Sequence, residues 1–267
     1  MLLEKEKKEY SDKGYFIKKN FIESKKLKEL NNIIDKSQAK TFVPYSNSVP
    51  WGYGNLIENV EIINKISLKK KIKYLSGFLS HGKAICNLLM VANKPQFIGP
   101  DVEWHQEFLN INTYAPGYNP LEDLDKFLQV FIALDDHRIE NGPLYVFEGS
   151  HKEGILPYEN IINSHLNHKR RITFEALHDL SNNYSCEPVL LKKGDAIIFN
   201  HLLVHGSPPN LSKFRRRAMI LQLKIEKNER DLNLFQNESN YRNNFILNEI
   251  KKRRERIESQ NIYSVYK

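Results

Sequence analysis

Two clusters of residues, far apart in the chain, carry side chains that could bind one metal ion. His105 and Glu107 are separated by a single residue, so on extended backbone both side chains leave the same face. His205 lies in a later apolar segment and could supply a second imidazole. Two imidazoles and one carboxylate make the facial triad that leaves positions on ferrous iron open, which is what oxygen chemistry needs.

We expect His205 to close a strand that begins near Ala196, and this strand carries a competing histidine. His201 lies four residues before His205, and a regular strand would place both imidazoles on the same face. The sequence His205-Gly206-Ser207 favours His205 as the ligand and leaves His201 as the alternative.

The segment after His205 contains consecutive arginines, one of which could hold a dicarboxylate. A guanidinium offers a carboxylate two parallel hydrogen bonds and stays ionised. We choose Arg216 for this role. Arg215 and Arg217 point to the opposite face by strand alternation and are expected to be solvated, with contact to an anionic substrate as the alternative. Lys94 precedes a proline, where a surface turn and a place near the pocket mouth explain it equally well.

Short apolar runs between residues 84 and 227 must position these side chains. Turn sequences such as Asn141-Gly142-Pro143 separate the runs, a pattern typical of an antiparallel sandwich or barrel. The runs are AICNLLMVA, FLNINTY, FLQVFIAL, LYVFEG, PVLLKKG, AIIFNHLLVHG and AMILQLKI. The sequence therefore predicts a mainly β fold with flanking helices.

The segments on either side of these runs have a different character. Residues 1–83 are mostly helical support, including a helix that Ser24 caps. Within them, 38–58 contains several prolines and glycines and is expected to be an irregular loop that could form a lid. Residues 228–267 form a charged, partly helical tail. We interpret 1–267 as a single domain with its core at 84–227.

The composition indicates a globular protein of the reducing cell interior. Hydrophobic residues make up 40% and aromatic residues 11% of 267 residues, enough for a packed core. Cys86 and Cys186 give neither a disulfide framework nor a paired metal motif. No segment has the length and apolarity of a membrane span or signal peptide, so we expect a cytoplasmic protein. The net charge of +8 lies partly in the tail, where a solvated helix face explains it, and we expect no nucleic-acid partner.

Three blocks of the sequence together resemble the phytanoyl-CoA dioxygenase family of iron- and 2-oxoglutarate-dependent oxygenases. They are WHQE at 104–107, QVFIALDD with ENGPLYVFEGSHKEG within 129–154, and GDAIIFNHLLVHGSPPNLSKFRRRAMI at 194–220. The resemblance implies a double-stranded β-helix, which is a cupin-like jelly roll, with helices packed on its outer face. It also implies that Fe(II) lies inside this fold.

The resemblance assigns roles to individual residues as well. The positions that match the iron ligands of the family are His105, Glu107 and His205. Arg216 matches the anchor for the distal carboxylate of 2-oxoglutarate, Ser207 would assist it through its hydroxyl, and Asn87 would reach the other end of the cosubstrate. The implied reaction uses Fe(II), O2 and 2-oxoglutarate to hydroxylate a small, possibly anionic molecule, with release of succinate and CO2.

Glu107 departs from the family pattern, which usually has aspartate at this position. The extra methylene moves the carboxylate outward, but a glutamate oxygen still binds divalent metals, so we expect an active iron site. Related halogenases have a small residue here, so the occupied position favours a hydroxylase. Two alternatives stay open: a jelly-roll binding protein that has lost turnover, and a metal-dependent cupin-type isomerase or hydrolase. The sequence does not indicate the oligomeric state.

Overall fold

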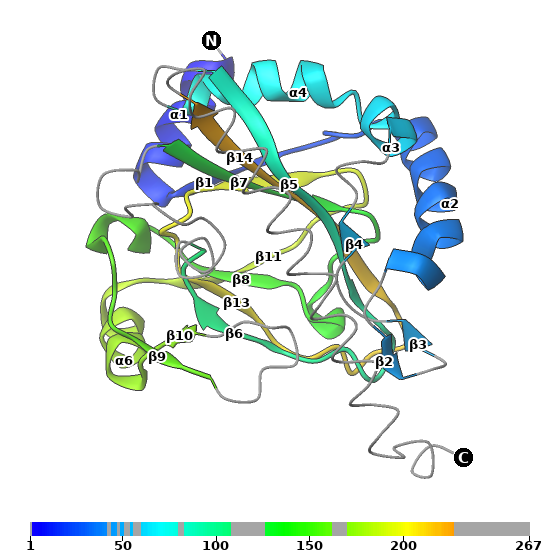
Figure 1. The fold of residues 1–267 in the computed structure, drawn as a ribbon. Helices are drawn as coiled ribbons and strands as arrows, with labels where there is room; N and C mark the ends of the chain where they lie inside the picture. The colour runs from blue at the N-terminus through cyan, green and yellow to red at the C-terminus, as the bar shows by residue number, and fades with distance from the viewer. Residues whose placement is uncertain are drawn as a thin grey trace.

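Two antiparallel β-sheets make up the body of the protein (Figure 1). This computed structural model describes residues 2–41, 44–46, 49–50, 54–55, 60–79, 83–107, 126–161 and 170–226. The larger sheet has the strand order β1 (Tyr15–Lys18), β12 (Ala196–Phe199), β7 (Phe127–Ala133), β14 (Arg216–Glu226), β5 (Lys83–Lys94), β4 (Gly54–Asn55). The smaller sheet has the order β11 (Cys186–Val189), β8 (Leu144–Phe147), β13 (His205–Ser207), β6 (Val102–His105).

Strand β7 shows how the apolar runs build a core on both faces of the larger sheet. Every residue of this strand is buried. Leu128, Val130 and Ile132 pack in one core with the N-terminal helices, and Phe131 and Ala133 pack in another with β8 and β11. Strand alternation sends successive side chains to opposite faces, so a continuous apolar run is what a strand covered on both faces requires.

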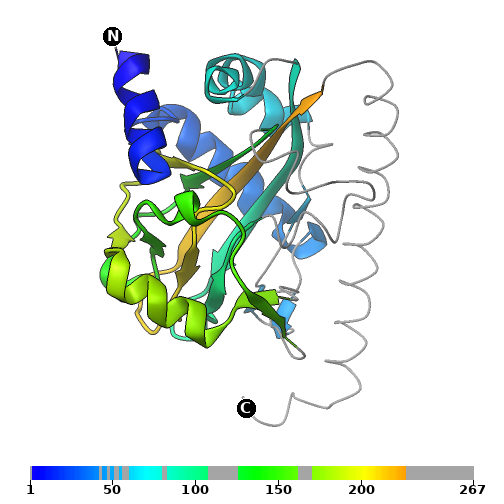
Figure 2. The same ribbon diagram turned by 90° about the vertical axis from the view of Figure 1, so that its left-hand side faces the viewer.

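Helices cover the outer face of the larger sheet (Figure 2). Leu30, Ile34, Ile62 and Leu75 on these helices are fully buried against the sheet. The N-terminal helices are α1 (Leu2–Lys13), α2 (Ser24–Thr41), α3 (Val60–Lys65) and α4 (Leu68–Leu75), followed by the short 3-10 helix η1 (Ser76–Phe78). None of the helices within the described residues is long and apolar enough to cross a membrane.

Smaller elements complete the described structure. Strand β2 (Pro44–Ser46) pairs with β3 (Val49–Pro50), and β9 (Tyr158–Asn160) pairs with β10 (Arg170–Ile172). Helix α6 (Phe174–Asn183) packs on the smaller sheet through Ala176 and Leu180, which contact a core that includes Phe147. The 3-10 helices η3 (Ile139–Asn141) and η4 (Ser150–Glu153) flank β8 in the chain.

The predicted fold class, a mainly β double-stranded β-helix with flanking helices, is confirmed. The expected strand FLNINTY at 108–114 and the tail at 228–267 lie outside the described residues. The expected irregular loop at 38–58 is wrong where this segment is described, because residues 38–41 continue α2 and the short strands β2, β3 and β4 follow. The rest of 38–58 lies outside the described residues. The division of the chain into one domain with these boundaries therefore stays a prediction.

One expected strand is wrong, because His205 does not close the strand that begins at Ala196. Strand β12 ends at Phe199, and a turn follows in which the Leu203 amide donates to the Asn200 carbonyl at 2.9 Å. His205 then opens β13. The chain needs this turn because β12 belongs to the larger sheet and β13 to the smaller one.

Candidate active site

Neighbouring strands β6 and β13 bring the two predicted imidazole ligands together. His105 ends β6, His205 begins β13, and the two are direct partners in this antiparallel pair. Their ring centroids lie 4.2 Å apart, and the ring of His205 also meets Phe199 of the larger sheet at 5.0 Å. Glu107 follows just past the end of β6, and the ligand atoms of His105, Glu107 and His205 all lie within 4.8 Å of one another.

Backbone carbonyl groups orient both imidazoles. Nδ1 of His105 lies 2.7 Å from the Glu103 oxygen, and Nδ1 of His205 lies 2.8 Å from the Leu203 oxygen. A carbonyl oxygen can only accept, so each Nδ1 carries a proton, and each Nε2 is the atom that can offer a lone pair to a metal. The two Nε2 atoms lie 3.4 and 3.5 Å from Oε1 of Glu107. Metal-ligating histidines usually have this arrangement, with the second ring nitrogen bonded to a carbonyl or carboxylate.

The charges of these side chains suit a divalent cation. Burial alone would raise the pKa of Glu107, but its contacts with His105 and His205 outweigh burial and hold that pKa well below the usual range. Burial, and then the charge of nearby His105, lower the pKa of His205. At neutral pH the site therefore contains a carboxylate and the neutral imidazole of His205. This donor set of nitrogen and oxygen fits Fe(II) and leaves part of the coordination sphere to other ligands.

Gln106, between two of the candidate ligands, fixes the backbone that carries them. Its side chain is fully buried, and its Nε2 donates to the carbonyl oxygens of Gly154 and Leu202, both at 2.7 Å. Its Oε1 accepts from the Leu156 amide at 3.0 Å. No role was predicted for this glutamine from the sequence. The signal was present, because a polar residue between two same-face ligands must point to the opposite face.

Arg216 and Ser207, the two residues predicted to anchor the cosubstrate, meet at the far end of β13. Arg216 is the first residue of β14 and is only 3% exposed. Its Nε donates to the Gly142 oxygen at 3.0 Å, its Nη2 lies 3.4 Å from the Ser207 hydroxyl, and its guanidinium lies over the Phe131 ring. Burial lowers the pKa of Arg216 to about 9, which still leaves the guanidinium protonated at neutral pH.

The two remaining candidates from the sequence are Asn87 and His201. Asn87 is part of β5, but its side chain lies outside the described part of the structure. His201 is buried in the turn after β12, where its ring meets Phe127 edge-on at a centroid distance of 5.9 Å. The group of possible metal ligands found in the described residues contains His205 and not His201.

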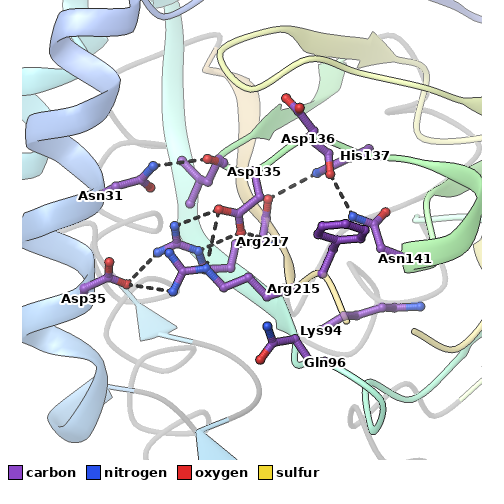
Figure 3. Close-up of polar contacts among 12 residues, drawn as sticks. Asn31, Asp35, Lys94, Gln96, Asp135, Asp136, His137, Asn141, Arg215 and Arg217 are labelled. Carbon is purple, nitrogen blue, oxygen red and sulfur yellow. Dashed lines mark hydrogen bonds and ion pairs between the residues drawn. The ribbon is translucent and has the colours of Figure 1, made fainter. Parts of the chain in front are cut away.

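The expectation that Arg217 is solvated is wrong. Its side chain is fully buried, and Figure 3 shows it between two acidic residues. Nε and Nη2 donate to the two carboxylate oxygens of Asp135 at 2.9 and 3.0 Å, and Nη1 donates to Asp35 of α2 at 2.7 Å. Arg215 is 45% exposed and lies 3.6 Å from both carboxylates. Strand alternation correctly predicted that Arg217 points to the opposite face from Arg216. The sequence did not show that helix α2 covers that face.

Comparison with known proteins gives matches over most of the chain. The model of the phytanoyl-CoA dioxygenase family matches residues 10–218. The peroxisomal phytanoyl-CoA dioxygenase of Bos taurus is 22% identical over 236 residues, which cover 80% of this chain and 66% of that protein. A probable alpha-ketoglutarate-dependent hypophosphite dioxygenase of Stutzerimonas stutzeri is 24% identical over 233 residues, covering 81% of this chain and 76% of that protein.

The fold is also similar to that of solved structures. The structure of EctD from S. alaskensis with 2-oxoglutarate and 5-hydroxyectoine gives a TM-score of 0.68 at 17% identity, covering 83% of this chain and 75% of that one. The chain spans just under two thirds of the bovine relative, at 66% of its length.

Proposed function

This chain belongs to the phytanoyl-CoA dioxygenase family, and from this premise we propose that it is an Fe(II)- and 2-oxoglutarate-dependent dioxygenase that hydroxylates a small molecule. The observation that carries the proposal is the group of His105, Glu107 and His205. Its ring tautomers, its carboxylate and its mixed nitrogen and oxygen donors are those of a facial triad for ferrous iron.

The residues of the triad would hold the iron and leave room for other ligands. Bound Fe(II) and 2-oxoglutarate would supply the activation of O2 that oxidises a substrate C–H bond, with 2-oxoglutarate converted to succinate and CO2. The protein contributes ligand geometry, because the carbonyl oxygens behind His105 and His205 fix both rings before any ion binds.

Arg216 and Ser207 would bind the distal carboxylate of 2-oxoglutarate. The Gly142 carbonyl accepts from Nε of Arg216, which fixes the plane of the guanidinium and directs its other donors. The Ser207 hydroxyl accepts from Arg216 and can turn its own hydrogen toward a bound carboxylate. Asn87 on β5 is proposed to reach the other end of the cosubstrate.

Glu107 supports hydroxylation in preference to halogenation. Its carboxylate reaches both imidazoles in spite of the longer side chain. The position that a halide would need is therefore filled by a protein ligand. This geometry also favours an active iron site over a fold that has lost its metal.

We infer a small-molecule substrate, which could be anionic, and a cytoplasmic location. Relatives are named for compounds as different as phytanoyl-CoA and hypophosphite, so the family alone does not select one compound. The location is supported by Cys86 and Cys186, which are both free thiols, as in proteins of reducing compartments.

Anaerobic titration of Fe(II) into metal-free protein with 2-oxoglutarate present tests the proposed function. We expect a weak visible charge-transfer band, because the cosubstrate would bind directly to the iron. His205→Ala should abolish the band through loss of the metal, and Arg216→Ala should shift it to higher 2-oxoglutarate concentration.

The matched control is His178→Ala, which removes an exposed imidazole of α6 and should leave the band unchanged. Folded wild-type protein that binds Fe(II) but gives no band would overturn the dioxygenase and favour a cupin-type isomerase or hydrolase. Protein that binds no Fe(II) would favour a binding protein.

A further inference from the structure

Lys94 is a buried lysine beside the anchor arginine. It ends β5 and is the direct partner of Arg216 on β14, so the two side chains share one face of the sheet. Only 1% of Lys94 is exposed, which is unusual for lysine and shows that a surface turn does not explain this residue.

The ammonium group of Lys94 binds the turn that follows the last ligand. Nζ donates to the carbonyl oxygen of Ser207 at 3.2 Å and also to that of Pro208. Arg216 contacts the same turn through the Ser207 hydroxyl. Lys94 thus holds the backbone of Ser207 while Arg216 meets its side chain.

The backbone of Lys94 is held as firmly as its ammonium group. Nδ2 of Asn210, which is fully buried, donates to the carbonyl oxygens of Lys94, Pro95 and Phe214 at 3.1, 3.0 and 2.7 Å. The side chain therefore starts from a fixed point. Its length then sets the distance between β5 and the turn at 207–208.

The distribution of carboxylates also sets this pair of cations apart. Arg217 is neutralised by Asp35 and Asp135. Within the described residues, neither Lys94 nor Arg216 forms an ion pair, and their hydrogen bonds go to carbonyl and hydroxyl oxygens. Burial and then the charge of Arg216 lower the pKa of Lys94 well below its usual value. Asp101 acts on Lys94 and Asp135 acts on Arg216 in the opposite direction, but neither carboxylate forms an ion pair with them. Two adjacent buried basic groups without an ion-pair partner in the described part of the chain favour binding of an anion from solution.

We infer that Lys94 is a positioning residue for the cosubstrate: it holds the turn at Ser207 and Pro208 so that the Ser207 hydroxyl and the Arg216 guanidinium face one carboxylate. The inference rests on the proposed function and goes beyond it, because Lys94 need not touch 2-oxoglutarate itself. It predicts that Lys94 controls affinity for 2-oxoglutarate and leaves affinity for iron unchanged.

The test compares Lys94→Met with Lys94→Gln in the full chain. Methionine keeps the length and the apolar stem but cannot donate, whereas glutamine restores a neutral donor. We measure three quantities anaerobically: the Kd of Fe(II), the Kd of 2-oxoglutarate for the iron-loaded protein, and the rise in melting temperature that 2-oxoglutarate causes. Lys71→Met is the matched control, because Lys71 on α4 is a partly buried lysine that also donates to a carbonyl oxygen, that of Phe21.

We expect Lys94→Met to raise the Kd of 2-oxoglutarate about tenfold or more, since hydrogen bonds from a charged donor are lost. Its Kd for Fe(II) should stay within about twofold of the wild type, and the thermal shift caused by 2-oxoglutarate should shrink in parallel. Lys94→Gln should recover part of the affinity. Lys71→Met should lower the melting temperature and leave both Kd values unchanged.

The inference is overturned if Lys94→Met binds 2-oxoglutarate as the wild type does, or if it loses Fe(II) and 2-oxoglutarate affinity together, which would indicate general damage to the fold. If Lys94→Met does not fold, Lys94→Gln decides between the same outcomes. Failure of the proposed function is distinguishable, because then the wild-type protein itself would bind no 2-oxoglutarate and the role of Lys94 would fall with it.

Discussion

The carboxylate of Glu107 reaches both imidazoles at distances slightly longer than those of neighbouring ligands at right angles around one ion. Ligands about 2.1 Å from a metal at right angles to each other lie about 3 Å apart. Oε1 of Glu107 lies 3.4 and 3.5 Å from the Nε2 atoms of His105 and His205. At the scale of single residues, the longer side chain is therefore compatible with the site as the backbone builds it.

We predict that both shortening and neutralising this side chain weaken metal binding. Glu107→Gln should reduce Fe(II) affinity by about 100-fold or more, because a neutral amide is a poor substitute for the carboxylate. Glu107→Asp should reduce it by about tenfold, because the carboxylate retreats by one carbon–carbon bond from a fixed backbone. Anaerobic equilibrium dialysis measures both. Tighter iron binding by Glu107→Asp would show that the site is built for aspartate and contradict this geometry.

Sequence reasoning was strongest for residues that act through their own chemistry. His105, Glu107, His205 and Arg216 were chosen by type and spacing, and the structure gathers the first three around one point. The burial of Lys94 was not predicted, because it depends on which strand lies opposite, and local sequence does not contain that information. The contacts of Arg217 were hidden for a similar reason, because local sequence does not show that helix α2 covers this residue.

At the scale of elements, the cluster around Arg217 joins helix α2 to the larger sheet. Asp35 comes from α2, Asp135 follows β7, and Arg217 belongs to β14. The Arg217 amide also donates to Asp135 at 3.0 Å, so backbone and side chain are both fixed (Figure 3). Arg216 is the preceding residue, so its side chain lies on the opposite, inner face of the strand. The contacts of Arg217 on the outer face therefore fix the strand that carries Arg216.

We expect Arg217→Met to destabilise the protein by about 3 to 5 kcal/mol, because the variant loses a fully buried cation and leaves the largely covered Asp135 without the guanidinium that binds both of its oxygens. Arg215→Met removes a half-exposed arginine near the same carboxylates and should cost about 1 kcal/mol or less. Urea unfolding at pH 7 measures both free energies. Equal losses in the two variants would show that burial of the Arg217 pair adds nothing.

The elements differ in how much of them the sequence could predict. The runs that became β5, β7, β8 and β14 are long and apolar, so their type was clear. Helix α6 was missed, although Thr173 caps it by accepting from the Ala176 amide at 3.3 Å. Only Ala176 and Leu180 of this short helix are buried, and so few apolar positions give a weak helical period.

At the scale of the whole molecule, the site lies where the two layers meet. The smaller sheet supplies His105 and His205, and the larger sheet supplies Arg216 and Lys94. The helices on the outer face of the larger sheet stiffen it without entering the site (Figure 2). The family resemblance implied helices on the outer face, whereas the crossing between sheets after β12 was not predicted, because the apolar residues 202–204 continue the apolar run of β12 after only two polar residues.

The packing of the two layers also buries His137, and protonation of this histidine makes the stability of the fold depend on pH. His137 is 2% exposed, its Nε2 lies 3.2 Å from the Arg217 carbonyl, and its ring meets Phe131. Burial, and then the charge of Arg216, lower its pKa to about 3, although Asp135 and Asp136 act in the opposite direction.

Stability should therefore fall as the pH falls below neutrality. An imidazole in the unfolded chain has a pKa of about 6.5, so between that value and about 3 the unfolded state binds a proton that the folded state does not. For His137 alone, the free energy of unfolding should drop by about 2 kcal/mol from pH 7 to pH 5. His137→Gln can still donate to the Arg217 carbonyl but has no group that titrates. In urea unfolding of the metal-free protein, the drop in the free energy of unfolding from pH 7 to pH 5 should therefore be smaller in this variant than in the wild type by that amount. His178→Gln changes an exposed histidine and should show the same drop as the wild type. If His137→Gln also shows the wild-type drop, the acid sensitivity does not come from His137.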